Sequence, residues 1–321
     1  MIHLTFVTPL AGLIALLGTV PLLVLFAVSD YAKSVRSALS VDEPRFSRSV
    51  TAGAIVAVAI LVGLAAAQPV LAQAEVRRVR SDAEALFVID TSRSMLASVD
   101  PTGTTRLDRA KAEAVRLRAE LPELKVGVAS LTDRTLPHLF PNADEDLFRA
   151  TVDDAIGIEQ PPPIAYLNTG VTTFAALTAI VTRGFFTPSV SHRVAVVFTD
   201  GETRPFDASG LGLVLRRSPG VRPIFVHVWH PNELVYNGGI PEPDYVPDPT
   251  SAAKLEGAAR AARGKAFAEG DLSGAADAVR SYMASGPTMA QERAEREFPL
   301  SRILLLLAGA PLLVLLVRLS R

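Results

Sequence analysis

Two carboxylates and three hydroxyls stand at places in this sequence where side chains could do chemistry: Asp90, Ser92, Ser94, Thr172 and Asp200. Each follows a predicted strand or opens a predicted helix. Carboxylate and hydroxyl oxygens are ligands that hard cations prefer, so we expect Mg²⁺, with Mn²⁺ or Ca²⁺ as alternatives. With only two carboxylates among the five groups, the cation would keep spare positive charge, which leaves room for an acidic group from a partner.

Each of these motifs alone has a plainer interpretation. Asp and Ser after a strand are usually turn or cap residues, and Thr172 alone favours an N-cap. Asp200-Gly201 alone favours a turn. Because all three motifs occur in order, each next to a predicted strand end or helix start, the combination favours one shared site.

The elements that would position these side chains alternate between strand and helix. Short apolar runs predict buried strands, and apolar residues at helical spacing predict helices. The expected strands are Ala85–Ile89, Lys125–Leu131, Val194–Thr199, Pro223–Trp229 and Lys265–Ala268. The expected helices are Arg106–Glu120, Asp144–Ile156 with Asn142 as N-cap, Thr173–Thr182, Ser251–Arg263 ended by Gly264, and Ser273–Ala284. This alternation predicts an α/β, doubly wound, mostly parallel sheet with its site at the carboxyl ends of the strands.

Three apolar stretches flank this block and predict transmembrane helices over residues 1–30, 49–74 and 299–318. The loop at 31–48 carries Lys33, Arg36, Arg45 and Arg48, so we expect it to be cytoplasmic. The folded domain at 80–285, followed by a linker at 286–298, would then lie outside the cytoplasm. These features predict a multi-pass protein of the plasma membrane.

The composition excludes several classes of protein. The formal net charge is −1, without the basic excess that nucleic-acid binding usually requires. The chain has no cysteine, so it has no disulfide, no thiolate metal site and no cysteine nucleophile.

The motifs D-T-S-R-S at Asp90–Ser94, the threonine at Thr172 and T-D-G at Thr199–Gly201 resemble the metal-ion-dependent adhesion site of von Willebrand factor A (VWA) domains. The resemblance implies that Ser92 and Ser94 bind the metal directly and that Thr172 binds it directly or through water. It implies that Asp90 and Asp200 act mostly through water, and that a partner's Glu or Asp completes the shell. The loop before Thr172 has one glycine, so Thr173, and less favourably Thr169, stay open as alternatives.

A narrower resemblance covers nearly the whole chain. The two N-terminal apolar stretches, the A-A-A-Q-P sequence at Ala65–Pro69, the domain that follows and the C-terminal apolar stretch are similar to bacterial aerotolerance-operon (Bat-type) VWA proteins. That resemblance implies MoxR-type AAA+ ATPases and other VWA proteins as partners, and a role in envelope stress, assembly or metal insertion.

The segment His230–Thr250 is long and rich in proline for a connection between a strand and a helix. It leaves the edge that carries the metal residues, so we expect it to flank the cation and to contact the partner through Tyr236 and Tyr245. The leading hypothesis is therefore a non-enzymatic, metal-dependent protein-binding module on a membrane. The alternative is a metal-dependent hydrolase or phosphoryl-transfer enzyme at the same site, with Glu202 or Asp133 as its base.

Overall fold

The structure is a computed structural model, and it describes residues 2–17, 20, 24, 48–73, 76–160, 162, 172–292 and 296–319. The chain divides into two units. Unit 1 comprises Met1–Glu75 and Ala294–Arg321, and unit 2 comprises Val76–Arg293. All five residues of the expected metal site belong to unit 2.

Unit 2 is built on a sheet of six strands within its described residues, in the order β11-β8-β7-β4-β5-β6. Only β6 runs antiparallel to its neighbour; the other pairs are parallel. The strands are β4 (Ala83–Asp90), β5 (Lys125–Leu131), β6 (Thr135–Asn142), β7 (His192–Thr199), β8 (Arg222–His227) and β11 (Lys265–Ala268). The mostly parallel α/β class expected from the sequence is confirmed.

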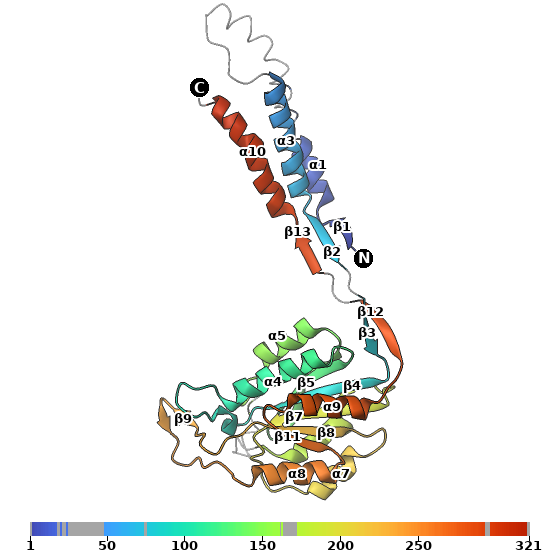
Figure 1. Cartoon of the computed structure of the whole chain (residues 1–321), viewed down its shortest axis with the longest axis vertical. Helices are drawn as coiled ribbons and strands as arrows, with labels where there is room; N and C mark the ends of the chain where they lie inside the picture. The colour runs from blue at the N-terminus through green and yellow to red at the C-terminus, as the bar shows by residue number, and fades with distance from the viewer. Residues whose placement is uncertain are drawn as a thin grey trace, which may run out of the picture. The chain divides into compact units, whose positions relative to one another are not determined.

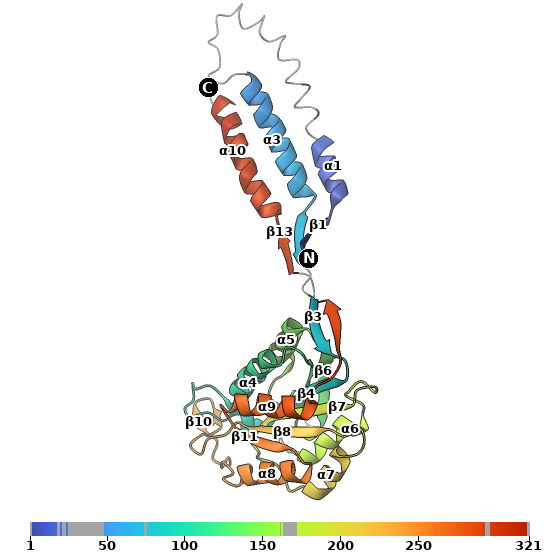
Figure 2. The same ribbon diagram turned by 45° about the vertical axis from the view of Figure 1, so that its right-hand side comes forward.

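Helices cover both faces of this sheet (Figures 1 and 2). One face packs against α4 (Arg106–Glu120), α5 (Glu145–Ala155) and α9 (Leu272–Met283). The other packs against the 3₁₀-helix η3 (Phe174–Thr178), α6 (Ala179–Thr182), α7 (Ala208–Leu215) and α8 (Ser251–Ala261). A second 3₁₀-helix, η1 (Arg93–Leu96), follows β4, and a two-stranded ribbon joins β9 (Tyr236–Asn237) to β10 (Ile240–Pro241).

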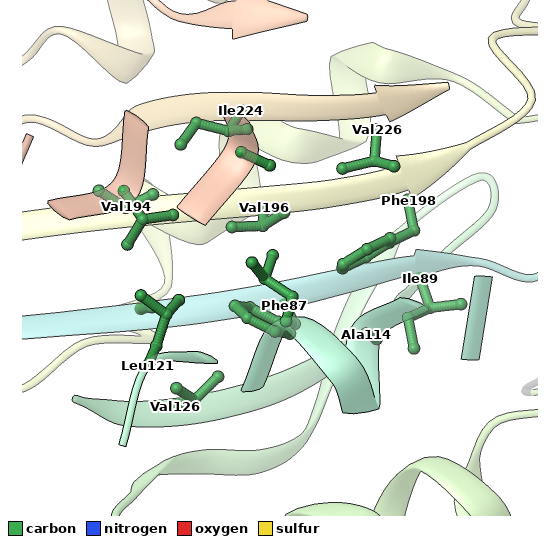
Figure 3. Close-up of a cluster of buried hydrophobic side chains, with 14 of the residues drawn as sticks. Phe87, Ile89, Ala114, Leu121, Val126, Val194, Val196, Phe198, Ile224 and Val226 are labelled. Atoms are coloured by element: carbon green, nitrogen blue, oxygen red, sulfur yellow. The ribbon is translucent and has the colours of Figure 1, made fainter. Parts of the chain in front are cut away.

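The strands alternate their side chains between two cores because successive residues of a strand point to opposite faces. Figure 3 shows the core beneath α4 and α9, where Phe87 of β4 lies at the centre. Its ring centroid is 5.5 Å from that of Phe148 and 5.6 Å from that of Phe198. Burying one such aromatic ring stabilises the fold by about 1.5–3 kcal/mol, so this cluster fixes β4 and β7 relative to each other.

The strand order reverses at the centre of the sheet. From β4 the chain continues to β5 on one side and returns later to β7 on the other. Ligands of doubly wound sheets bind outside the carboxyl ends of the strands at such a switch point. Ile89 pairs with Phe198 in the β4–β7 register, so Asp90 and Thr199 end their strands side by side.

Some local predictions were wrong. Asp144, not Asn142, is the N-cap of α5, because its carboxylate accepts hydrogen bonds from the N–H groups of Asp146 and Leu147. Gly264 does not end α8 in a left-handed conformation; Arg263 does, at φ 57°. Gly264 instead allows a close approach, since a Cβ there would lie 2.0 Å from the carbonyl oxygen of Pro223. The expected helix 173–182 is a 3₁₀-helix followed by one short α-turn.

Other elements were not predicted. They include β6 and α7, and a ladder in which β3 (Val76–Arg80) pairs antiparallel with β12 (Thr288–Glu292). This ladder lies at the amino edge of the sheet and carries the chain into and out of unit 2. Arg80 fastens it to the domain by donating to the carbonyl oxygens of Met283 and Ala284.

Unit 1 contains α1 (Pro9–Leu17), α3 (Arg48–Ala66) and α10 (Ser301–Leu319), and α3 and α10 run side by side (Figures 1 and 2). A sheet of three strands in its described part has the order β1 (Ile2–Phe6), β2 (Pro69–Gln73) and β13 (Arg296–Pro299). The apolar stretch at 49–74 is therefore helical only to Ala66, and the linker at 286–298 contains β12 and most of β13.

The sequence led us to expect three membrane-spanning helices. In the part of the chain that the structure describes, no helix combines the length and the apolar character that crossing a bilayer requires. The expected cytoplasmic loop at 31–48 lies outside the described residues except for Arg48.

Candidate metal centre

Asp90 is the centre of the hydrogen-bonding network at the carboxyl edge of the sheet. Its side chain is fully buried. One carboxylate oxygen accepts from the backbone N–H of Ser92 at 3.0 Å and from the hydroxyl of Thr172 at 2.7 Å. The other accepts from the hydroxyl of Thr199 at 2.6 Å, because Thr199 ends the neighbouring strand. The parallel register of β4 and β7 thus sets the position of this carboxylate.

Thr172 reaches the site through a bridge between backbones. It pairs with Thr203 in an isolated parallel β-bridge, and Arg204 N–H donates to its carbonyl oxygen at 3.0 Å. The side chain of Thr172 is fully buried against Asp90. It is the hydroxyl of Thr172 that donates to Asp90, whereas the backbone N–H of the alternative Thr173 donates to Thr132 O and η3 begins after it. Thr169, the other alternative, lies outside the described residues.

Ser92 and Ser94 bring their hydroxyls together where η1 begins. The two Oγ atoms lie 3.0 Å apart. Burial raises the pKa of both Asp90 and Asp200, and the hydroxyls of Ser92 and Ser94 oppose that rise at Asp90 and Asp200 respectively. The structure therefore brings all five predicted residues into one cluster; that they hold a metal ion stays a prediction.

The positive charge near the two carboxylates of this cluster is too small to balance their two negative charges. Burial, followed by the negative charges of Asp90 and Glu202, raises the pKa of Asp200 to about 8 against the opposing effect of Arg106. Burial also raises the pKa of Asp90, although the hydrogen bonds from Thr199, Ser92 and Thr172 oppose it. A cation beside these carboxylates would favour their ionised forms.

A buried arginine that the sequence analysis did not single out lies behind Asp200. Arg106, the first residue of α4, is completely inaccessible to solvent. Its Nη1 donates to Asp200 at 3.1 Å, to Glu202 at 3.0 Å and to the hydroxyl of Tyr245 at 2.9 Å. Its Nε donates to Glu233 at 2.7 Å. Arg106 thus joins the cluster of five oxygen donors to the segment after β8.

Glu202 is the acceptor that closes this network. It accepts from the indole N–H of Trp229 and from Tyr245, each at 3.0 Å, and from the backbone N–H of Asp248 at 3.2 Å. Burial raises the pKa of Tyr245, so its hydroxyl keeps the proton that it donates. Trp229 stacks on His227 with ring centroids 5.8 Å apart, and His227 Nε2 lies 3.0 Å from the backbone oxygen of Asp200.

Hydrogen bonds and an ion pair connect the segment His230–Thr250 to the loop after β4. Ser98 and Leu234 exchange two backbone hydrogen bonds of 3.0 Å, and Arg93 forms an ion pair with Glu242. The two tyrosines predicted to contact a partner differ in placement. Tyr245 points inward to Glu202, whereas the hydroxyl of Tyr236 donates to Val99 O at 3.3 Å near the surface.

The donor set fits a hard divalent cation. Two serine hydroxyls, one threonine hydroxyl and two carboxylates are oxygen ligands only. Gly201 helps to place Asp200: it has φ 75°, and a Cβ there would lie 2.9 Å from Ser251 O. Within the described residues no group of three or more His, Asp or Glu could hold a metal ion.

The doubly wound sheet, with Asp90, Ser92, Ser94, Thr172 and Asp200 together at its switch point, defines the class of the fold: a VWA-like domain. Comparison with solved structures agrees. The conserved hypothetical protein BatB from Bacteroides thetaiotaomicron is 19% identical with a TM-score of 0.51, and the match covers 63% of this chain and 100% of that one. The resemblance to Bat-type VWA proteins is thus confirmed for the fold.

Two further solved structures match with lower TM-scores. An aerotolerance-related membrane protein from Bacteroides fragilis, crystallised with multiple mutations to serine, is 21% identical over 63% of this chain and 98% of that chain, with a TM-score of 0.48. Proximal thread matrix protein 1 from the mussel byssus, with zinc in its MIDAS motif, is 12% identical over 64% and 48%, with a TM-score of 0.38. No protein-family model matches the chain. No curated protein matches it either.

Proposed function

We propose that unit 2 binds a divalent cation, Mg²⁺ in the first place, and through it an acidic side chain of a partner protein. The observation that carries this proposal is the convergence of five oxygen donors from three loops at the switch point of the sheet. Ser92, Ser94 and Thr172 would bind the cation, and Asp90 and Asp200 would balance its charge. The cation would supply an electrophilic anchor for the partner's carboxylate.

The surroundings of the site support binding rather than turnover. Of the two residues considered as a general base, Glu202 already accepts hydrogen bonds from Arg106, Trp229, Tyr245 and the Asp248 N–H. Its carboxylate oxygens are therefore already engaged within this network rather than directed at a water molecule beside the cation cluster. We therefore propose a binding module, and expect no metal-dependent hydrolysis of phosphate esters.

The partner in this proposal is a protein that presents Glu or Asp. A MoxR-type AAA+ ATPase and a second VWA protein are the candidates that the family resemblance suggests, with a role in envelope assembly or stress. Tyr236, with Ile240 71% exposed on the same ribbon, would contact the partner beside the cation. Tyr245 would support the site indirectly, by donating a hydrogen bond to Glu202.

We propose further that unit 1 associates with a lipid membrane. Its helix α10 leaves large apolar side chains uncovered, among them Leu306, 81% exposed, and Leu313, 62% exposed. Soluble monomers seldom expose extended apolar patches of this kind. With this association unit 2 would be tethered at a membrane surface.

The metal proposal predicts stabilisation by cation. A ligand that binds only the folded state stabilises it by about 2.7 kcal/mol at a hundredfold excess over its Kd. The chain should therefore melt at a higher temperature in excess Mg²⁺ or Mn²⁺ than in EDTA, followed by the fluorescence of Trp229, its single tryptophan. Asp90→Ala and Asp200→Ala should lose most of this increment, and Ser92→Ala serves if either variant fails to fold.

The matched control is Asp154→Ala, on the exposed side of α5, which should respond to Mg²⁺ as the unaltered chain does. Capture of a purified MoxR-type ATPase should then require Mg²⁺ and fail with Asp200→Ala. Equal metal responses in the control and both site variants would mean that the site is misassigned. Equal capture with and without chelator would discard the acidic-anchor mechanism even if metal binds.

A further inference from the structure

A polar cavity opens at the amino edge of the same sheet, opposite the edge that carries the cluster of oxygen donors. It has a volume of about 380 Å³ and is bounded by the start of β7, the turn between α7 and β8, and the ends of α8 and α9. Four arginines line it, Arg193, Arg216, Arg222 and Arg263, together with His192 and Tyr282. The formal charge of its lining is +4 with the histidine neutral, in a chain whose net charge is −1.

The guanidinium groups are held in place mainly by backbone carbonyls. Arg193 donates to Val190 O at 3.1 Å and to two neighbouring carbonyl oxygens. Arg222 donates to Arg263 O at 3.1 Å, and its guanidinium lies 5.6 Å from the centroid of the Tyr282 ring. Arg216 donates to Ala261 O. Each guanidinium has five donors, so these contacts orient the groups and leave other N–H groups free for a ligand.

No Asp or Glu lines this cavity. Within the described part of the chain, no ion pair joins any of the four arginines to Asp or Glu. Two carboxylates lie close to the lining and have other partners. Asp82, which interacts with His192, is paired with Arg80 at 2.9 Å. Glu84 stands opposite Arg193 in the β4–β7 register, and its carboxylate accepts hydrogen bonds from the N–H and the hydroxyl of Thr187.

A purely structural role would explain only part of the charge. α7, α8 and α9 all end at this edge, and arginines near helix C-termini offset the helix dipoles. Each dipole is equivalent to about half a negative charge, so three helices offset about one and a half of the four positive charges. About two and a half remain, which is more than one carboxylate would balance but suits phosphate, with a charge of about −2 or more for a diphosphate.

We propose that this cavity is a phosphate-binding site, occupied by a free phosphate compound or by the headgroup of an anionic lipid. The planar guanidinium groups of Arg222 and Arg263 can each donate two parallel hydrogen bonds to a pair of phosphate oxygens. The volume is at the small end of the range for ligand sites and fits one or two phosphate groups. The site is separate from the cation cluster, which lies at the other ends of the same strands.

The test uses the 321-residue chain in EDTA, so that phosphate cannot bind through a cation at the carboxyl edge. Binding of inorganic diphosphate is measured by titration calorimetry. In parallel, flotation compares vesicles of phosphatidylcholine alone with vesicles that also contain phosphatidylglycerol. The variant is Arg222→Gln/Arg263→Gln. The matched control is Arg217→Gln, an exposed arginine next to Arg216 that does not line the cavity.

We expect saturable diphosphate binding that the double variant weakens at least about tenfold, equivalent to about 1.4 kcal/mol, and that Arg217→Gln leaves nearly unchanged. Binding that depends on phosphatidylglycerol, shows the same pattern of variants and occurs without affinity for diphosphate identifies the lipid as the source. If the double variant fails to fold, Arg216→Gln replaces it. The proposal is overturned if neither probe binds, or if Arg217→Gln weakens binding as much as the variants of the cavity.

Discussion

His138 on β6 shows how a single buried side chain can make the stability of unit 2 depend on pH. It is half-buried, and its Nε2 lies 2.8 Å from the hydroxyl of Ser130 on the neighbouring strand. Burial lowers the pKa of His138 below its ordinary value of 6.5. The unfolded chain therefore takes up this proton at a higher pH than the folded chain does.

The resulting prediction concerns acid. The contribution of His138 to the free energy of unfolding is fully present above its unfolded pKa of 6.5 and is lost as pH falls below that value. The loss is at most about 1.4 kcal/mol per pH unit for one proton. His138→Gln keeps a group that can hydrogen-bond Ser130 but removes the titration, so its stability should fall less on acidification. Urea unfolding followed by Trp229 fluorescence measures this, and parallel curves for both proteins would contradict it.

At the residue scale, the sequence could predict which five side chains come together, but not which residues support them. Asp90, Ser92, Ser94, Thr172 and Asp200 were found because each stands next to a predicted strand end or helix start. Arg106 carries no such local signal, since it lies 94 residues from Asp200 and looks like an ordinary helix residue. Only the packing of α4 beside the switch point turns its guanidinium towards three carboxylates.

The helix α4 depends on its first turn to place Arg106. Thr105 forms a capping box with Asp108: the hydroxyl of Thr105 accepts from the Asp108 N–H at 3.1 Å, and the Asp108 carboxylate accepts from the Thr105 N–H at 3.3 Å. Arg106 follows directly, so the cap and the network behind the site share one turn of helix.

We predict that Thr105→Ala lowers the free energy of unfolding by about 1 kcal/mol through loss of the cap. It should also reduce the stabilisation by Mg²⁺, because Arg106 would be held less firmly against Asp200. The control is Thr151→Ala in the middle of α5, where the hydroxyl bonds only to Leu147 O, and it should change stability by less than about 0.5 kcal/mol. Equal losses in the two variants would mean that the cap is not what stabilises α4.

Elements with a strong apolar pattern were predicted closely, and β5 at Lys125–Leu131 and α4 at Arg106–Glu120 have the expected bounds. Elements that are defined by their pairing with another strand were not predicted. β6 contains two prolines and alternates poorly, and the two-residue strands β9 and β10 exist only because they face each other. The ladder of β3 and β12 joins segments that begin 212 residues apart in the sequence, which no local pattern can indicate.

At the scale of the whole molecule, the boundaries of unit 2 predict a fragment that folds by itself. Both core clusters and all pairings of the six described strands lie within Val76–Arg293. A fragment of residues 76–293 should therefore unfold cooperatively, followed by Trp229 fluorescence. The shorter fragment 80–285 lacks β12 and the fully buried Val79, and should be less stable by about 1.5 kcal/mol or more. Equal stability would show that the ladder is dispensable.

The ladder also determines how unit 2 would carry mechanical load. β3 enters and β12 leaves at the amino edge, with Val76 opposite Glu292 at the far end of their pairing, while the cation cluster lies at the carboxyl edge. If both chain connections were held while a partner pulled on a bound cation, both strands would be under tension in the same direction. Tension of that kind would not slide one strand past the other, so it would not shear the ladder.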